Sequence, residues 1–435
     1  MKYKPVIGLE VHIELKTKSK MFCGCSANYF GQKPNTHTCP VCLGLPGALP
    51  VPNKTAIDWC IMIGLALNCD IANFSKFDRK NYFYPDLPKG YQISQYDQPF
   101  CLKGFVELSD GKKIGITRVH MEEDTGKLIH QDENSLIDFN RSGVPLVEIV
   151  TEPDFENAKE VIEYLKKLQQ IIRYLNVSDA DMEKGNMRLE PNISLKIEGI
   201  EELPNYKVEV KNINSFRFVE KAIEYEIKRQ TEILCKEQIP AQETRGWDED
   251  KQKTVPQRTK EEANDYRYFP EPDIPPLIFT QNKIQELKSQ MPEMPGQTFK
   301  RFKTNYNLNE YYIEILTKEK LTVNYFDESV AVGKEHNVSP NQIANLLVNK
   351  NINVNSTLPA DLIKNILNST KITEIEEPEL KKIISRVLKE NKKAVKDYKS
   401  GKETAIMFLL GQVMKTSRLK LNASKIKELL KKMLQ

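Results

Sequence analysis

Val6-Ile-Gly-Leu-Glu-Val-His-Ile-Glu-Leu15 is the stretch that decides the fold of this 435-residue chain. Its odd positions from Ile7 to Leu15 are all apolar, and Glu10, His12 and Glu14 alternate with them. This period of two predicts a half-buried strand that turns an apolar face to a core and displays Glu-x-His-x-Glu on the other face. Taken alone, such a polar face is more simply a solvated surface.

A second alternating stretch, residues 114–121, leads into three consecutive acids, Glu122, Glu123 and Asp124. In a strand, Arg118, His120 and Glu122 share one face, whereas Glu123 has the opposite parity. If the two strands are neighbours, their imidazole and carboxylate groups could together bind a divalent metal. For the pair of strands we favour a site over a solvated surface.

The remaining patterns predict an α+β fold with an antiparallel sheet and flanking helices. We expect helices over 54–67, 156–175 and 216–234, and strands over 187–196 and 206–211. Residues 137–150 read as two strand-like halves joined by a Ser-Gly turn, in which Asn140, Arg141 and Glu148 stand out. The charged, proline-punctuated residues 243–273 look poor in strands, and from residue 297 on the composition predicts bundled helices.

The charge is unevenly distributed along the chain. Residues 381–435 carry 16 Lys and Arg against 4 Asp and Glu, a net charge of +12, while residues 1–380 carry 48 against 56, a net charge of −8. Such a basic C-terminal segment suggests an acidic partner, with nucleic acid as the first candidate. A solvated lysine-rich helical face is the simpler alternative.

Four of the eight cysteines are clustered near the N-terminus, in the pattern Cys23-x-Cys25 and Cys39-x-x-Cys42 around a turn-rich loop. Four thiolates close a tetrahedral zinc site and leave no catalytic position, so we expect a structural zinc knuckle at residues 23–42. The alternative is four reduced thiols without a metal. This cysteine usage, the low hydropathy and the lack of a long apolar run favour a cytoplasmic protein without membrane contact.

Residues 77–97 are rich in tyrosine and polar residues and poor in aliphatic ones. They suit a hydrogen-bonding cavity into which a loop presents Lys80, Asn81 and Tyr82, although an exposed tyrosine-rich loop is an equal alternative. Standard nucleotide-binding loops and hydrolase motifs are missing from the sequence. If the acids bind Mg²⁺, the natural chemistry is phosphoryl transfer, because the metal neutralises phosphate charge without a protein nucleophile.

The order of several motifs strongly resembles the GatB family, the B subunits of the aspartyl/glutamyl-tRNA(Asn/Gln) amidotransferases. The resemblance runs nearly end to end and is carried by residues 8–15, 78–86, 118–127, 138–148, 265–273 and 408–415. It implies a cradle domain at 1–290, a helical domain at 291–375 and a small basic, tRNA-binding tail of the YqeY type at 376–435. The related archaeal GatE carries a large inserted domain, for which this chain is too short.

The family's activity implies ATP-dependent phosphorylation of the side-chain carboxylate of misacylated Glu-tRNA(Gln) or Asp-tRNA(Asn), followed by attack of ammonia. GatA would supply the ammonia from glutamine, and GatC would hold the subunits together. Which of the two misacylated tRNAs is the substrate does not follow from the sequence.

The resemblance also implies roles for individual residues. Glu10, His12, Glu122 and Glu123 match the family's Mg²⁺ and kinase site, and Lys80 and Glu123 match positions near the mouth of the ammonia channel. Glu190 lies in Arg-Leu-Glu-Pro-Asn, where the family usually has Arg-Cys-Asp-Ala-Asn. It is therefore a candidate metal ligand whose side chain is longer than that of the usual Asp. Cys23, Cys25, Cys39 and Cys42 match a zinc site that some members have lost. The region before the tail is shorter than usual.

A hypothesis of a different class also fits the sequence. In it, the chain is a zinc-bearing RNA-binding protein without catalysis, and the acidic cluster is structural.

Overall fold

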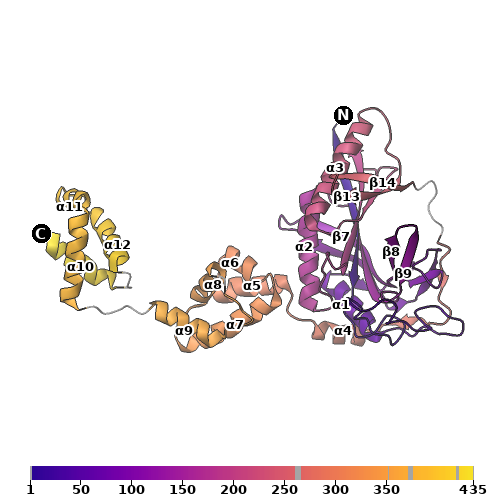
Figure 1. Ribbon diagram of the computed structural model, residues 1–435, viewed down its shortest axis with the longest axis horizontal. Coiled ribbons are helices and arrows are strands. Elements are labelled where there is room, and N and C mark those ends of the chain that lie inside the picture. The colour runs from indigo at the N-terminus through magenta and orange to yellow at the C-terminus, as the bar shows by residue number, and fades with distance from the viewer. Residues whose placement is uncertain (1, 260–265, 351, 371–375, 418–420, 435) are drawn as a thin grey trace. The chain divides into compact units, whose positions relative to one another are not determined.

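The computed structural model describes residues 2–259, 266–350, 352–370, 376–417 and 421–434. They form two compact units, Met1–Thr298 and Phe299–Gln435 (Figure 1). The predicted α+β class is confirmed, because the first unit is built on a large sheet and the second is helical.

In the described part of the chain, the central sheet of the first unit has nine strands, and β1 (Tyr3–Glu14) is the middle one. On one side of it follow β10 (Pro145–Thr151), β7 (Lys113–Glu123), β6 (Cys101–Glu107) and β2 (Asp70–Ile71). On the other side follow β11 (Met187–Ile197), β12 (Val208–Lys211), β13 (Glu243–Asp248) and β14 (Lys253–Thr259). Neighbouring strands are antiparallel except β12 and β13, which are parallel.

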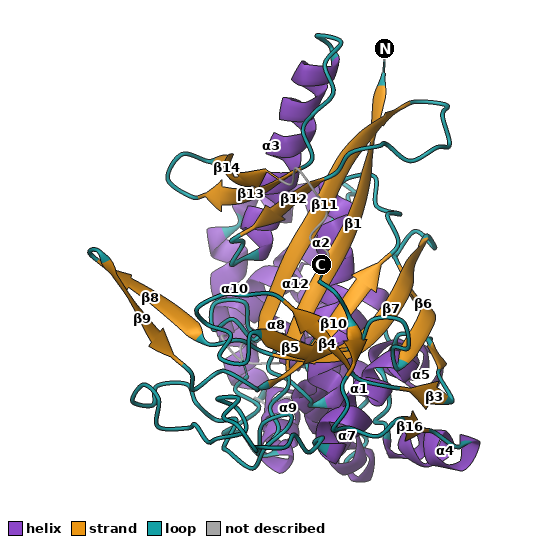
Figure 2. Cartoon of the chain, turned by 90° about the vertical axis from the view of Figure 1, so that its right-hand side faces the viewer, coloured by secondary structure: helices purple, strands orange, loops and turns teal. Residues whose placement is uncertain are grey.

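Helices cover one face of this sheet: α1 (Lys54–Ala66), α2 (Ala158–Leu175) and α3 (Phe216–Leu234) (Figure 2). The odd residues of β1 pack into the core together with the apolar stripe of α2, which includes Val161, Leu165 and Leu168. Since strand side chains alternate, the even residues of β1 face the other side, which the helices leave open. The alternation in the sequence therefore places Glu10 and His12 on the uncovered face.

Short strands frame that face. A small sheet joins β4 (Asp78–Asn81), β5 (Tyr91–Ser94) and β15 (Phe269–Pro270), and β3 (Phe74–Ser75) pairs with β16 (Leu277–Ile278). A hairpin of β8 (Lys127–Gln131) and β9 (Asn134–Asp138) follows the acidic stretch. Gly143, with a φ of +85°, forms the predicted turn between β9 and β10 because its conformation suits glycine. Helix α4 (Gln281–Gln290) completes the elements of this unit.

The prediction that residues 243–273 are poor in strands is wrong for its first half, where β13 and β14 form a hairpin. These strands were hard to recognise because their inward face is charged. Arg245 is buried against Glu226 of α3 at 3.2 Å and against Glu243 at 2.7 Å. Paired charges therefore replace the apolar alternation that usually marks a strand.

The second unit is a series of helices: α5 (Pro295–Tyr306), α6 (Glu310–Leu316), α7 (Lys320–Glu335), α8 (Pro340–Asn349), α9 (Pro359–Thr370), α10 (Glu377–Glu390), α11 (Lys392–Lys399), α12 (Ala405–Ser417) and α13 (Ala423–Leu434). Helices α10, α12 and α13 share an apolar core that includes Ile384, Leu409 and Leu430. The predicted boundary between 375 and 376 adjoins residues 371–375, which lie outside the described residues, and it stays a prediction. Among the described helices, none is both long and apolar enough to cross a lipid bilayer.

Candidate active site

Three strands align their polar residues in rows across the uncovered face of the sheet. His12 of β1 lies opposite Glu148 of β10, which lies opposite His120 of β7. The row on one side contains Glu10, Val150 and Arg118, and the row on the other side contains Glu14, Leu146 and Glu122. The two predicted strands are thus separated by one strand, and β10 adds a carboxylate between their histidines.

The side chains of His12, Glu122 and Glu148 meet closely enough to bind one cation, with their ligand atoms all within 4.8 Å of one another. His12 Nε2 lies 3.2 Å from Glu122 Oε1 and 3.6 Å from Glu148 Oε2, and His120 Nε2 lies 3.2 Å from the same Glu148 oxygen. Two carboxylates and an imidazole on rigid strands form a donor set that fits a divalent metal.

Electrostatic interactions within the cluster favour the protonated form of His12 and the ionised forms of Glu122 and Glu148. Burial alone lowers the pKa of His12, but hydrogen bonds to Glu122 and Glu148 outweigh it and raise that pKa to about 10. Burial acts against ionised Glu122, yet nearby Lys80 and His12 hold its pKa below the usual range. For Glu148 the same burial is outweighed by the two histidines, and its pKa is well below the usual value. The cluster therefore contains two carboxylates and the imidazolium of His12, and a metal bound there would displace the proton of that imidazolium.

A second cluster lies one row further along the sheet. Glu10, Glu190 and Glu209, on β1, β11 and β12, place carboxylate oxygens within 4.8 Å of one another. Lys211 pairs with Glu190 at 2.8 Å and with Glu209 at 3.4 Å. Burial raises the pKa of Glu190, and Lys211 opposes that shift. Lys211 therefore offsets part of the negative charge of Glu190 and Glu209, while the pKa of Glu190 stays above its usual value.

Both clusters form the floor of one cavity of about 670 Å³. Its cationic lining comprises Lys80, Arg118, Arg188, Lys207 and Lys211. Asp124 is held beside the floor by Arg188 and by Arg141, whose Nε is 3.6 Å from it. A cavity that combines buried acids with this many cations suits a highly charged substrate such as a phosphate ester.

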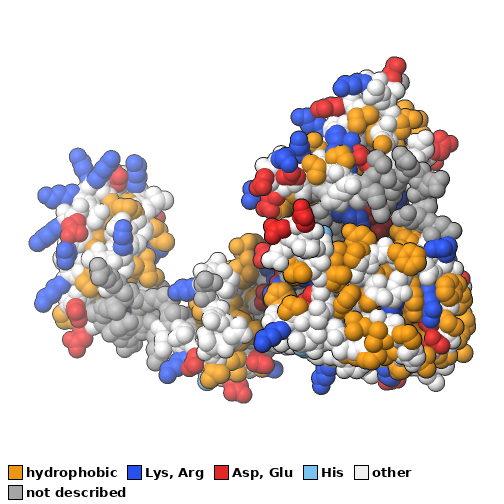
Figure 3. All heavy atoms as spheres, turned by 45° about the vertical axis from the view of Figure 1, so that its right-hand side comes forward, with side chains coloured by type: hydrophobic (Ala, Val, Ile, Leu, Met, Phe, Trp, Pro, Cys, Tyr) orange, Lys and Arg blue, Asp and Glu red, His pale blue; other side chains and the backbone are white. Residues whose placement is uncertain are grey.

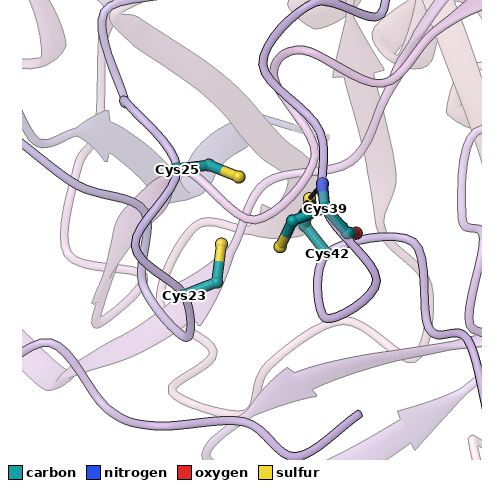
Figure 4. Close-up of side chains that lie close together, drawn as sticks. All are labelled: Cys23, Cys25, Cys39 and Cys42. Atoms are coloured by element: carbon teal, nitrogen blue, oxygen red, sulfur yellow. Dashed lines mark hydrogen bonds between the residues drawn. The ribbon is translucent and has the colours of Figure 1, made fainter.

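The cysteine cluster lies in the loop between β1 and α1, and Figure 4 shows the four sulfur atoms turned toward a common centre. The Sγ atoms of Cys23, Cys25, Cys39 and Cys42 lie within 4.8 Å of one another, and those of Cys39 and Cys42 are 3.8 Å apart. Zinc–sulfur bonds of about 2.3 Å in a tetrahedron require sulfur atoms about 3.8 Å apart, so the four residues fit zinc. A hydrogen bond from Cys23 lowers the pKa of Cys42 to about 5.

Lys20 fixes this knuckle to the turn between β9 and β10. Its side chain is fully buried, and its Nζ donates to the carbonyls of His37 at 2.8 Å and of Phe139 at 3.3 Å. Its charge also favours the thiolate of Cys42. The sequence offered no signal for this buried lysine.

The structure brings together Glu10, His12, Lys80, Glu122 and Glu190, which all line the cavity. Glu123 is separated from them. Its Oε1 accepts from the amide of Ile93 at 2.9 Å and pairs with Lys89, and its Oε2 lies near Gly143, which also adjoins Cys42. The described lining of the cavity includes Glu122 but not Glu123.

Two carboxylates of the clusters had no role assigned from the sequence, Glu148 and Glu209. Glu148 is the one acid in the otherwise apolar run 144–150, a signal that could have revealed it. Glu209 alternates with Lys207 and Lys211, which resembles an ordinary solvated strand and gives no such signal.

Comparisons with known proteins identify the family. A family model described as the GatB/GatE catalytic domain matches residues 5–285, and one described as the GatB domain matches residues 303–434. The B subunit of the aspartyl/glutamyl-tRNA(Asn/Gln) amidotransferase of Thermoanaerobacter sp. (strain X514) is 47% identical over an alignment of 472 positions, gaps included, which covers 99% of each chain. The proteins of the same name from Caldicellulosiruptor saccharolyticus and Thermodesulfovibrio yellowstonii are each 44% identical over an alignment of 480 positions, gaps included, which covers 100% of each chain. This chain therefore belongs to the family of aspartyl/glutamyl-tRNA(Asn/Gln) amidotransferase B subunits.

Proposed function

We propose that this chain is the subunit of a tRNA amidotransferase that uses ATP to activate the side-chain carboxylate of misacylated Glu-tRNA(Gln), Asp-tRNA(Asn) or both. The observation that carries the proposal is the cluster of His12, Glu122 and Glu148 on the floor of a cation-lined cavity. The family's name supplies the substrate class.

The reaction needs activation because a carboxylate is a poor electrophile. One oxygen of the substrate carboxylate attacks the γ-phosphorus of ATP, which forms an acyl phosphate and releases ADP. Ammonia then attacks the carbonyl carbon, the carbon–oxygen bond to phosphate breaks, and the amide loses a proton. The protein's part is to position two anions and to stabilise the charge that moves between them.

Mg²⁺ would be held by His12, Glu122 and Glu148, with Glu10 and Glu190 as further candidates in the adjoining cluster. When bound there, it would neutralise phosphate charge and orient the transferring oxygens. Lys80 and Arg118 line the same cavity and can attract the anionic substrates into it. His120 holds Glu148 in place from the opposite strand.

Ammonia would come from the GatA subunit through a channel near Lys80 and Glu123. Gln92 supports this route, because it lines the cavity while its Nε2 donates to the carbonyl of Glu123 at 2.6 Å. A protein partner is also favoured by the hydrophobic side chains on the surface of the first unit (Figure 3), which include exposed Phe30, Leu49 and Phe83. We therefore propose a heterotrimer with GatA and GatC.

Zinc at the four cysteines would stabilise the loop between β1 and α1. The basic C-terminal helices would bind tRNA, since Lys and Arg side chains gather on their surface (Figure 3). Such a translation enzyme would work in the cytoplasm.

Reconstitution tests the proposed function. The chain is combined with GatA, GatC, glutamine, ATP and Mg²⁺, and conversion of Glu-tRNA(Gln) and Asp-tRNA(Asn) is followed. We expect ATP-dependent amide formation that needs all three subunits. If the complex binds tRNA but neither consumes ATP nor forms amide, the second hypothesis, a zinc-bearing RNA-binding protein, is correct.

A further inference from the structure

Four tyrosines form a continuous aromatic series along the rim of the cavity: Tyr82, Tyr266, Tyr268 and Tyr96. The rings of Tyr82 and Tyr266 meet edge to face at 5.9 Å, as do those of Tyr266 and Tyr268 at 6.0 Å. Tyr268 and Tyr96 are stacked, with ring centroids 4.3 Å apart and planes inclined by 11°. We call these four residues the tyrosine rim.

The stack ends at the solvent. Tyr96 is 61% exposed although one face of its ring lies against Tyr268. The exposed face of an aromatic ring at the edge of a polar cavity interacts only weakly with water. Another planar ring can therefore stack on it. The rim therefore has an open end that fits a planar group of a ligand.

The rim also carries positive charge. Lys80 lies over the ring of Tyr266 at 5.1 Å, and its ammonium is drawn toward Glu122 and Glu148. Aromatic rings joined with a cation along a groove are the combination that binds single-stranded nucleic acid, because bases stack and the backbone is anionic.

The rim lies on one side of the catalytic floor. Gln95 of the adjacent segment accepts from the amide of Met121 on β7 at 3.1 Å, and Ser94 donates to Glu122 at 3.4 Å. On the other side, near β11 and β12, a more apolar recess of about 360 Å³ adjoins the same floor at Glu10 and Asn192. The catalytic floor is thus bordered by the tyrosine rim on one side and by this recess on the other.

We propose that the tyrosine rim binds the single-stranded 3′ end of the aminoacyl-tRNA, with the terminal base stacked on Tyr96. The aminoacyl group, attached to the terminal ribose, then extends past Lys80 to the carboxylate cluster. This inference rests on the proposed function, since it specifies how that site holds its RNA substrate.

The open end of the rim favours an RNA strand over the base of ATP. A strand that enters from solvent can stack its last base on Tyr96 and continue outward with the preceding nucleotides. A mononucleotide has no such continuation. The recess on the far side of the floor remains available to the nucleoside of ATP.

Binding to a small RNA tests the rim directly. The probe is a hairpin RNA with a single-stranded CCA end, compared with the same hairpin lacking the terminal A, titrated against the full chain in complex with GatA and GatC. For the unchanged protein we expect loss of the terminal base to weaken binding by about tenfold. Tyr96→Ala should remove this preference, and Tyr96→Phe, which keeps the ring, should retain it.

Kinetics provide the second readout. Tyr96→Ala should raise KM for Glu-tRNA(Gln) by about tenfold and leave KM for ATP unchanged, whereas Tyr96→Phe should alter neither. An undiminished terminal-base preference in Tyr96→Ala, or a rise in KM for ATP instead of tRNA, would overturn the inference. If the unchanged complex forms no amide at all, the proposed function fails, and the hairpin titration still decides the inference about the rim.

Discussion

Glu122 and Glu123 are adjacent in β7, but their carboxylates point to different sides of the strand. Glu122 Oε1 lies 3.2 Å from His12 in the cavity, while Glu123 Oε1 accepts from the amide of Ile93 and pairs with Lys89. Both carboxylates are almost completely buried. Their replacement should therefore have different consequences.

Replacement of Glu122 by Gln should strongly reduce activity without unfolding the protein. The amide is isosteric, but it removes one negative charge from the cluster that would hold the metal. We expect the ATP-dependent rate to fall by roughly a hundredfold or more, since a loss of about 3 kcal/mol of transition-state stabilisation has that effect. Single-turnover assays of ATP cleavage measure it, with Glu201→Gln, an exposed site, as the control.

Replacement of Glu123 by Gln leaves Lys89 buried without its charged partner. Removing one member of a buried ion pair lowers the free energy of unfolding by about 3 kcal/mol. If Glu123 also lies on the ammonia route, glutamine-dependent amidation should be lost while tRNA binding persists at temperatures where the variant is folded. Denaturant unfolding and amidation assays measure the two effects, and full activity in Glu123→Gln would contradict the channel role.

Much of the first unit was predictable because its strands and helices are indicated by patterns that lie within single segments of the sequence. The alternation in 6–15 predicted β1 and both its faces, and the helical periodicity of 156–175 predicted α2. The pairing of strands is not local. Only the register of β10 between β1 and β7 places Glu148 between His12 and His120, and no periodicity within one segment reveals that position.

The second cluster and the strands around it were harder to predict. Lys207, Glu209 and Lys211 alternate as a solvated strand would, yet Glu209 is buried beside Glu190. Similarly, Arg245 can be buried within a strand because it forms an ion pair with Glu226 of α3. That partner lies 19 positions away in the sequence. Buried charges become recognisable only when their partners are in place.

Binding of Mg²⁺ should be strongly pH-dependent. His12 must be neutral to coordinate a metal, but in the metal-free cluster its pKa is raised to about 10. Below pH 10 the metal must therefore displace a proton, so the apparent affinity should rise by about tenfold per pH unit toward pH 10 and level off above it. Calorimetry in buffers with different ionisation enthalpies measures this proton release, and an affinity that is constant from pH 7 to 9 would contradict it.

The four cysteines should bind one zinc ion per chain. Chelation of that ion should lower the melting temperature of the first unit, because the loop between β1 and α1 would lose its closed metal site. Cys42→Ser should reproduce the loss of both zinc and stability, whereas Cys235→Ser, at an exposed site, should not. Metal analysis and thermal unfolding of the two variants test this prediction. A metal-free preparation of the unchanged protein that is as stable as the untreated one would refute the zinc assignment.

The basic tail should contribute salt-dependent affinity for tRNA. Lys382 and Lys389 line a groove on α10, and removal of one lysine–phosphate interaction should reduce the slope of log K against log salt by about 1. Replacing both by Gln should weaken tRNA binding most at low salt, while Lys318→Gln, exposed and outside the tail, should not. Filter binding over a salt series measures the slope. Equal slopes for the unchanged protein and the double variant would show that these lysines of the tail do not contact tRNA.

Glu14 should make the protein less stable as the pH rises from weakly acidic to neutral. Burial and the nearby charge of Asp124 raise its pKa from 4.5 to about 7, while Tyr29 donates to its carboxylate at 2.9 Å. Since the folded pKa exceeds the unfolded one, the stabilising contribution is complete below about pH 4.5 and disappears as the pH rises through 7. A shift of this size corresponds to at most about 3 kcal/mol. Glu14→Gln keeps the acceptor for Tyr29 without the charge, so its free energy of unfolding should change less between pH 5 and 8. Parallel pH profiles of the two proteins would show that Glu14 does not titrate in this range.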